Sequence, residues 1–181
     1  MLLTLSIQDF VIVDRVRLEF ARGFSVLTGE TGAGKSILVD ALMLVLGGRA
    51  ESSVVRNGRE RAEVSAEFDA SGLPALQAWL AQNDLGEEGG ECILRRVIDG
   101  GGRSRAYING RPGTVAQLRE AGERLVEIHG QHEHQSLMRP ASQRLLLDAF
   151  ADAEAIAAEV ARLHRRWRDL ADTRARALGD A

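Results

Sequence analysis

Cysteine and long apolar runs are nearly absent from this sequence of 181 residues. Cys92 is the only cysteine, which excludes an internal disulfide and favours a reducing compartment, with the thiol buried in a strand. The longest apolar run, residues 37–46, contains Asp40 and is too short to span a membrane. Asp9 and Asp14 flank the first apolar stretch, which does not fit a signal segment. We therefore expect a cytoplasmic protein with no membrane partner.

Lysine is equally scarce. The sequence has 23 lysine and arginine residues in total, and Lys35 is the only lysine among them. Since the formal net charge is −3, any contact with nucleic acid must be local. A compact ammonium suits a phosphate pocket in a way that a planar guanidinium does not. Lys35 is therefore a candidate phosphate contact.

Lys35 lies in a segment that fits the phosphate-loop pattern G-x-x-x-x-G-K-[ST]. Its residues are Gly29, Glu30, Thr31, Gly32, Ala33, Gly34, Lys35 and Ser36. Glycines let backbone N–H groups turn toward a β-phosphate, and the following helix directs its positive dipole end at the same charge. We expect Lys35 to reach the β- and γ-phosphates of ATP and Ser36 to ligate Mg²⁺. The alternative is a glycine-rich turn without a ligand, which the flanking strand-like and helix-like runs disfavour.

Patterns of apolar residues in residues 1–150 predict an α/β fold. Strands are expected at residues 1–7, 11–20, 24–28, 62–68, 91–99, 103–109 and 125–128, with a first turn at Gln8-Asp9. Helices are expected at residues 37–46, 73–85 and 114–123. Gly47-Gly48 ends the first helix, and a capping box of Thr114 and Gln117 opens the last. Two extended segments ahead of the strand that feeds the loop predict antiparallel additions to a mixed sheet.

The composition changes after Pro140 to alanine, leucine, arginine and acidic residues. Apolar residues then alternate in steps of four and three at Ile156, Val160, Leu163, Trp167 and Leu170, which is the seam of a coiled coil. We expect a first domain at residues 1–150 and the root of a coiled-coil arm at residues 151–181. An amphipathic helix that packs on the domain is the alternative.

An ATPase with this loop normally needs a second, acidic motif that holds Mg²⁺ and activates water. The nearest match is residues 145–148, a leucine run that ends in Asp148, but Ala149 follows where the catalytic base should be. The neighbouring residues favour a helix over a core strand. We therefore expect a phosphate loop without its catalytic carboxylates.

Residues 129–135 form a polar cluster with two interpretations. His129, His132 and His134 could imitate a metal site, although zinc needs fixed geometry and further ligands. Alternatively, the segment is a loop that leaves a core strand beside the nucleotide, where the Gln131 carbonyl ligates Mg²⁺ or orients water.

Two groups of arginines could meet phosphates. The first lies on and beside the hairpin at residues 91–109 and could contact DNA, although a solvated strand face is the alternative; its residues are Arg95, Arg96, Arg103, Arg105 and Arg111, with Tyr107. The second lies between Arg49 and Arg61, just after the phosphate-loop helix. Within it, Arg56 is our candidate for a nucleotide contact.

These residues together resemble the amino-terminal head segment of bacterial DNA repair proteins in the SMC-like branch of the ABC-type ATPases. The resemblance covers nearly the whole chain and rests on residues 1–20, 29–36, 107–111 and 128–135. Glu30-Thr31 is specific, because most relatives in the superfamily have a Pro-Asn-like pair there.

The resemblance implies a head built from both ends of a polypeptide that an antiparallel coiled coil joins. Two such heads enclose two ATP molecules, so the expected partners are the chain's own carboxy-terminal lobe, a second head and DNA, particularly its ends. Gln131 resembles the Q-loop glutamine that serves catalysis and Mg²⁺, with His129 and Gln135 as neighbouring registers. The signature motif and catalytic carboxylates belong to the carboxy-terminal half, so the resemblance implies ATPase activity only for the completed head.

Two other functions fit parts of the pattern. One is a structural DNA-tethering module in which nucleotide is a static clamp. The other is a P-loop kinase or GTPase, which the antiparallel segments and the arm disfavour, as does the lack of an Asn-Lys-x-Asp pattern.

Overall fold

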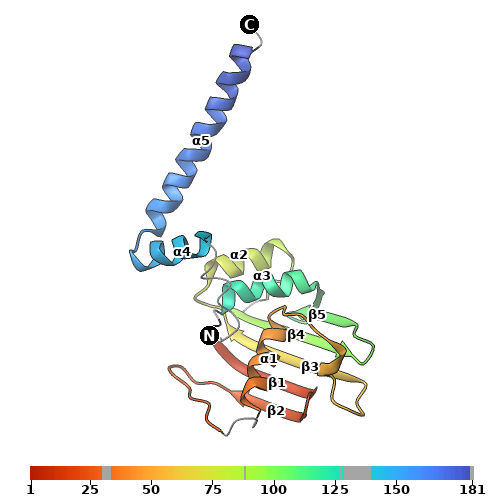
Figure 1. Cartoon of the computed structure of the whole chain (residues 1–181). Helices are drawn as coiled ribbons and strands as arrows, with labels where there is room; N and C mark the ends of the chain where they lie inside the picture. The colour runs from red at the N-terminus through yellow and green to blue at the C-terminus, as the bar shows by residue number, and fades with distance from the viewer. Residues whose placement is uncertain (30–33, 88, 127, 129–139, 180–181) are drawn as a thin grey trace. The chain divides into compact units, whose positions relative to one another are not determined.

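The computed structural model describes residues 1–29, 34–87, 89–126, 128 and 140–179 (Figure 1). The chain divides into two compact units, Met1–Glu127 and Ile128–Ala181. The first contains the sheet and three helices, and the second contains two helices. The domain boundary that the sequence predicts at residue 150 of this chain stays a prediction.

The first unit is built on one six-stranded sheet. Its strands pair in the order β2-β1-β3-β4-β5-β6, and every pair among the described residues is antiparallel. The strands are β1 (Leu2–Phe10), β2 (Val13–Glu19), β3 (Arg61–Asp69), β4 (Glu91–Asp99), β5 (Ser104–Ile108) and β6 (Arg111–Gly113). The described residues thus supply the antiparallel part of the predicted mixed sheet.

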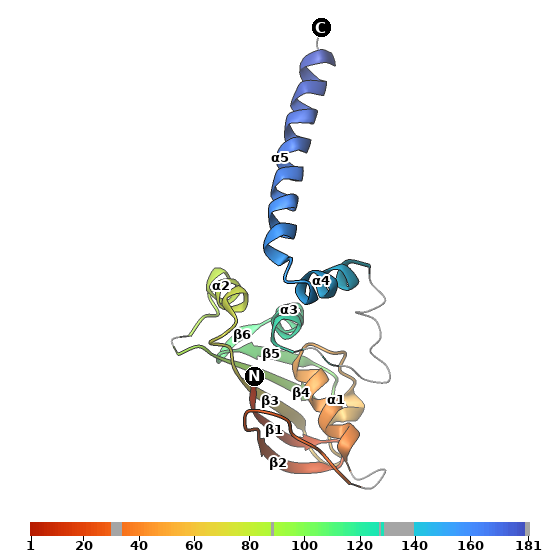
Figure 2. The same ribbon diagram turned by 90° about the vertical axis from the view of Figure 1, so that its left-hand side faces the viewer.

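Helices cover one face of this sheet (Figure 2). Those of the first unit are α1 (Lys35–Val45), α2 (Pro74–Gln82) and α3 (Val115–Leu125), with a short 3₁₀ turn, η1 (Ser52–Val54). The capping box that Thr114 and Gln117 form opens α3 as predicted. The second unit contains α4 (Pro140–Phe150) and α5 (Glu154–Gly179).

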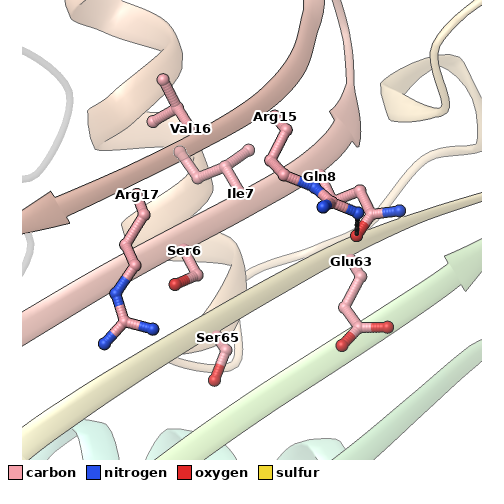
Figure 3. Close-up of a pocket in the computed structure, with 8 residues that line it drawn as sticks. All are labelled: Ser6, Ile7, Gln8, Arg15, Val16, Arg17, Glu63 and Ser65. Atoms are coloured by element: carbon pink, nitrogen blue, oxygen red, sulfur yellow. Dashed lines mark hydrogen bonds between the residues drawn. The ribbon is translucent and has the colours of Figure 1, made fainter.

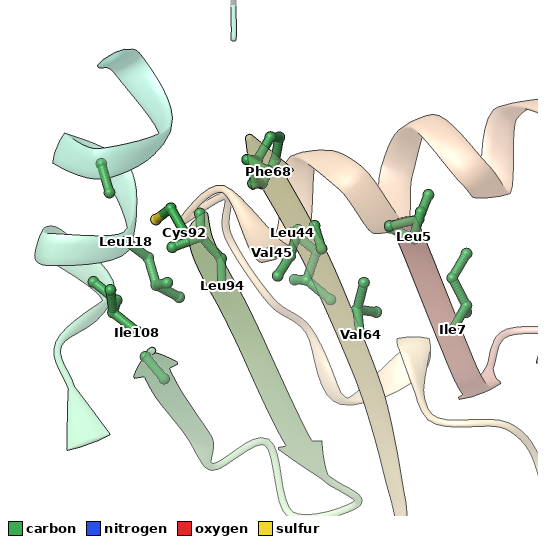
Figure 4. Close-up of a cluster of buried hydrophobic side chains, with 14 of the residues drawn as sticks. Leu5, Ile7, Leu44, Val45, Val64, Phe68, Cys92, Leu94, Ile108 and Leu118 are labelled. Carbon is green, nitrogen blue, oxygen red and sulfur yellow. The ribbon is translucent and has the colours of Figure 1, made fainter. Parts of the chain in front are cut away.

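The two faces of the sheet differ in polarity because side chains alternate along each strand. Toward the helices point buried apolar residues of β3 and β4, including Val64, Phe68 and Leu94, which pack against Leu44 of α1 (Figure 4). On the other face lie polar side chains of β1, β2 and β3 (Figure 3). There Arg15 donates a hydrogen bond of 3.2 Å to the Oε1 atom of Gln8. The core is therefore one layer between the sheet and its helices.

The first turn lies three residues later than the sequence predicts. β1 continues through Gln8 and Asp9 to Phe10, and the chain turns at Val11-Ile12. The Val11 N–H donates to the Val54 carbonyl at 2.8 Å, and Phe10 pairs with Val55. These distant contacts fix the turn, which explains why the local pattern missed it.

The predicted strand at residues 24–28 is absent, and the segment has no regular secondary structure. Phe24, Val26 and Leu27 are 94%, 70% and 54% exposed. A strand is stable only when a neighbouring strand satisfies its backbone groups. The preceding strand, β2, pairs with β1 and not with residues 24–28. The apolar pattern is real, but the described residues provide no strand beside it.

The predicted strand at residues 125–128 is also wrong at its start. Leu125 belongs to α3, since the Val126 N–H still donates to the Gly122 carbonyl at 3.0 Å. Val126 has extended backbone angles but lies in no strand, and Glu127 lies outside the described residues. The helix ends two residues beyond the predicted Glu123.

The second unit agrees with the sequence pattern. Residues 145–148 lie within α4, which supports rejecting them as an acidic-motif strand. The 26-residue α5 carries the predicted coiled-coil seam, whose five apolar side chains are between 49% and 69% exposed. Within the second unit, the described residues do not cover this seam, and the assignment of α5 to a coiled-coil arm stays a prediction.

Candidate nucleotide-binding site

The amino-terminal end of α1 has the geometry of a phosphate-binding helix end. Gly34 is the N-cap at φ 88°, a left-handed conformation that favours glycine, and no atom lies within 4 Å of where a Cβ would be. The conformation, not the space, therefore requires glycine there. Lys35 and Ser36 follow as the first two helical residues.

The Lys35 side chain turns back toward Gly29. Its Nζ atom donates a hydrogen bond to the carbonyl oxygen of Gly29, the first residue of the loop. Ser36 is exposed at the helix start. The two ends of the loop are thus joined by the side chain expected to reach the phosphates.

The electrostatics of this helix end suit an anion. The first turn of α1 carries no acidic residue, and no side-chain hydrogen bond caps this helix end at Gly34. The free N–H groups of a helix start and its dipole act like roughly half a positive charge. With Lys35 beside them, these groups fit the phosphates of a nucleotide such as ATP.

Several predicted site residues lie outside the described part of the chain. In the loop they are Glu30, Thr31, Gly32 and Ala33, and in the polar cluster they include Gln131, His129 and Gln135. Among the described residues, no group of three or more histidine, cysteine or acidic side chains could hold a metal ion. The roles predicted for Gln131 therefore stay predictions.

Arg56 lies beside the β1–β2 hairpin. Its NH1 atom is 2.6 Å from Oδ1 of Asp14, which also accepts a 3.1 Å hydrogen bond from NH2 of Arg59. The Arg56 backbone N–H donates to the Asp9 carbonyl at 2.9 Å. Arg56 is therefore ion-paired in this structure, and its predicted contact with nucleotide stays a prediction.

The opposite end of α1 is held by two arginines. Arg96 of β4 is 3% exposed and donates through NH1 to the carbonyls of Leu44 and Gly48, at 3.1 and 3.0 Å. Its Nε atom donates to Oγ of Ser104 at 2.6 Å, and NH2 of Arg119 donates to the Gly47 carbonyl at 3.1 Å. Burial lowers the pKa of Arg96, and the nearby charge of Arg119 lowers it further. The guanidinium remains charged, since the ordinary pKa of arginine is far above neutral pH.

Arg96 is buried, whereas the sequence prediction groups it with the surface arginines. Alternation along β4 contains the signal, because Arg96 is in phase with the buried Cys92, Leu94 and Ile98. Arg95 is out of phase and lies on the other face, 4.4 Å from the Tyr107 ring centroid and 3.5 Å from Glu63. The predicted arginine patch therefore loses Arg96, and Arg95 is partly neutralised.

Arg111 also has a local partner, since its NH1 atom donates to the Asp84 carbonyl.

No helix among the described residues has the length and apolar character to cross a membrane.

Sequence comparison identifies the family of the chain. A family model for the AAA domain matches residues 4–163. The DNA repair protein RecN of Xylella fastidiosa is 49% identical over 174 residues, which are 96% of this chain and 31% of that protein. The chain thus spans about a third of the length of the curated relative it matches.

Structural comparison finds SMC ATPase heads. One, solved in work on ATP-driven dimerization and DNA-stimulated activation of SMC ATPases, is 26% identical with a TM-score of 0.59, covering 81% of this chain and 97% of that chain. Another is the Smc head domain with an extended coiled coil from Pyrococcus furiosus, solved bound to the C-terminal domain of ScpA. It is 25% identical with a TM-score of 0.62, covering 82% of this chain and 41% of that chain.

These matches confirm the resemblance and the fold class that the sequence predicts. The chain therefore belongs to the AAA domain family, and within it to the amino-terminal head segments of the RecN type, with the fold of an SMC-like ATPase head lobe.

Proposed function

We propose that this chain is the ATP-binding half of an SMC-like ATPase head that acts in DNA double-strand-break repair and recombination. The observation that carries the proposal is the amino-terminal end of α1, where a left-handed Gly34 precedes Lys35 and the first turn has no acidic residue. Such an end binds phosphate through N–H groups and the helix dipole. The relative from Xylella fastidiosa, a DNA repair protein, supports the biological role.

The segment from Gly29 to Ser36 would hold ATP with Mg²⁺. Lys35 would neutralise charge on the β- and γ-phosphates, and Ser36 would ligate Mg²⁺ together with Gln131. His129 and Gln135 lie close to Gln131 in the sequence and are the alternative residues for its Q-loop role. Arg56 would add a nucleotide contact if it exchanged Asp14 for a phosphate oxygen, which is a charge-assisted partner of similar kind.

The exposed apolar segment before the loop supports a second lobe as partner. This segment has the apolar side chains of a strand, and three of them are largely exposed: Phe24, Val26 and Leu27. A carboxy-terminal lobe that supplied a neighbouring strand would bury these side chains and satisfy the backbone groups of residues 24–28. The same lobe would bring the signature motif and the catalytic carboxylates that this chain lacks.

The completed head would act as a dimer on DNA ends in the bacterial nucleoid. ATP binding would favour the engaged pair of heads and hydrolysis would release it, which is a population shift between two assemblies. The exposed seam of α5 supports an antiparallel coiled-coil arm that joins the two lobes. The Smc head domain from Pyrococcus furiosus was solved with an extended coiled coil.

Reconstitution of ATP turnover tests this proposal. The isolated chain should hydrolyse ATP negligibly, and adding the carboxy-terminal lobe should restore turnover that Lys35→Ala abolishes. Arg144→Ala, an exposed change in α4, serves as the matched control and should leave turnover unchanged. Robust Lys35-dependent hydrolysis by the isolated chain would contradict the proposal.

A static nucleotide clamp in a DNA-tethering module is the second candidate. The helical conformation of residues 145–148 is compatible with both functions, because these residues offer no acidic-motif strand in either case. The two functions differ in whether tethering needs hydrolysis. A complete protein without the acidic-motif base should lose sustained DNA bridging if the head cycles, and undiminished bridging through many cycles would favour the static clamp.

A further inference from the structure

The carboxy-terminal end of α1 is more tightly fixed than a helix end requires. Gly47 N–H bonds to the Leu44 carbonyl at 3.1 Å and Gly48 N–H to the Met43 carbonyl at 2.9 Å, which already closes the helix with a Schellman motif. Arg96 then adds two further bonds to this end, and Arg119 adds one. The extra donors therefore serve something besides capping.

The packing around this end leaves little room for movement. A Cβ on Gly47 would lie 2.6 Å from the Arg119 backbone nitrogen, and one on Gly122 would lie 3.0 Å from the Leu46 carbonyl oxygen. Backbone atoms of α1 and α3 thus touch directly. Arg96 of β4 donates to the same end of α1 from the sheet. Both the sheet and α3 therefore hold the carboxy-terminal end of α1.

Burying the Arg96 guanidinium has a cost that the fold must offset. No carboxylate among the described residues forms an ion pair with it, and it donates hydrogen bonds to neutral oxygens of Leu44, Gly48 and Ser104. Removing a charge from water is unfavourable unless hydrogen bonds and an electrostatic field compensate. The negative end of the α1 dipole supplies that field. The charge is therefore matched to the helix end, not to a single side chain.

The fixed end controls the position of the other end. α1 has 11 residues, so it is about 16 Å long at about 1.5 Å per residue. A tilt of about 10° around the held end would move Lys35 and Ser36 by roughly 3 Å over that length. Hydrogen bonds to phosphate oxygens need donor–acceptor distances of about 2.7–3.2 Å, so a displacement of this size would break them.

We propose that Arg96 is a positioning residue for the phosphate loop: by holding Leu44 and Gly48 against β4, it fixes where Lys35 and Ser36 meet the phosphates. The inference rests on the proposed nucleotide-binding function. It adds that ATP affinity depends on a side chain at the far end of the helix, which touches neither nucleotide nor metal. Ser104 supports the role, because its hydroxyl accepts the third hydrogen bond of Arg96.

The test is MgATP and MgADP binding to the complete protein that carries Arg96→Met, measured by calorimetry. Met keeps the bulk of the side chain and removes the donors. The dissociation constants of both nucleotides should rise about tenfold or more, because both carry the β-phosphate that the loop holds. Arg96→Lys, which restores one charged donor, should recover part of this loss, and Ser104→Ala should show a smaller loss.

Arg95→Met is the matched control, since Arg95 is the adjacent residue of β4 and lies on the other face of the sheet. It should bind both nucleotides like the wild type. A merely structural role for Arg96 would lower the binding stoichiometry and the melting temperature but leave the dissociation constant of the folded fraction unchanged. That result, or equal affinity of the Arg96 and Arg95 variants, would overturn the inference.

If Arg96→Met fails to fold, Arg96→Lys and Ser104→Ala give the answer, because each keeps some of the hydrogen bonds. Unchanged affinity in both folded variants would then overturn the inference. Lys35→Ala in the same assay separates the two proposals. Wild-type affinity in Lys35→Ala contradicts the proposed function, whereas loss in Lys35→Ala with wild-type affinity in the Arg96 and Ser104 variants contradicts the positioning role alone.

Discussion

Two sets of apolar side chains in this chain have opposite environments. Phe68 and Ile98 of the sheet unit are completely buried, whereas Phe24 before the phosphate loop and Trp167 in α5 are mostly exposed. The residue types are alike, so the difference lies in whether the chain supplies their packing partners. The antiparallel sheet with its helices buries its own apolar side chains, and we propose that the approach to the loop and the seam of α5 pack against partners.

The largest expected effect comes from removing a side chain of the buried set. Phe68→Ala should destabilise the isolated chain by about 3–5 kcal/mol, through lost burial and a cavity in the core. Phe24→Ala, the matched change in the exposed set, should cost less than about 0.5 kcal/mol. Urea unfolding of both variants measures the contrast, and equal losses would break the comparison.

The buried set also contains a titrating probe. Burial raises the pKa of the Cys92 thiol from 9.0 to about 11. Its contribution to stability is therefore complete below about pH 9 and is lost as the pH rises from 9 to 11, an effect on the order of 2–3 kcal/mol. Unfolding curves at pH 8 to 11 should show this loss in the wild type, and Cys92→Ala should lack that part of the pH dependence. Identical pH profiles would contradict the burial argument.

A change in the exposed set should appear only in association. Phe24→Ser should leave the unfolding of the isolated chain nearly unchanged. It should weaken binding to the carboxy-terminal lobe about tenfold to a hundredfold, since burying such a side chain contributes about 1.5–3 kcal/mol. Titration of labelled lobe against both chains measures this, with the exposed Arg144→Ala as control. An unchanged affinity would show that the segment is not the contact.

The smallest expected effect sharpens the claim that the sheet unit is complete. Thr114→Ala removes the 3.1 Å hydrogen bond from the Gln117 N–H and with it the capping box of α3. The cost should be about 1 kcal/mol, and the isolated chain should show all of it. A loss that appeared only after the second lobe was added would mean that α3 is not fully formed in the chain alone.

Local patterns predicted much of this fold from the sequence. Alternation located β3, β4 and β5, and the glycine pair located the end of α1 at Gly47-Gly48. These features succeed because each depends on residues close in sequence, such as a cap, a glycine turn or one face of a strand.

Several of the failures share one physical cause, which is dependence on partners that are distant in the sequence. Residues 24–28 have a strand-like pattern but find no neighbouring strand, and the first turn is set by the contact of Val11 with Val54. For the site, the structure has Lys35 and Ser36 as the first two residues of α1, where the pattern places them in the loop just before a helix. The pattern missed Arg96, although its phase along β4 contains the signal, because its acceptors lie at the end of α1, far away in the sequence.

The central claim is that the phosphate loop of this chain is one part of a composite site. Calorimetric titration of MgATP into the isolated chain, the carboxy-terminal lobe and their mixture tests it most directly. We predict weak binding by the chain alone, and tight binding of one ATP per pair in the mixture that Lys35→Ala abolishes. Failure of the mixture to bind ATP, or equally tight binding by the chain alone, would contradict the claim.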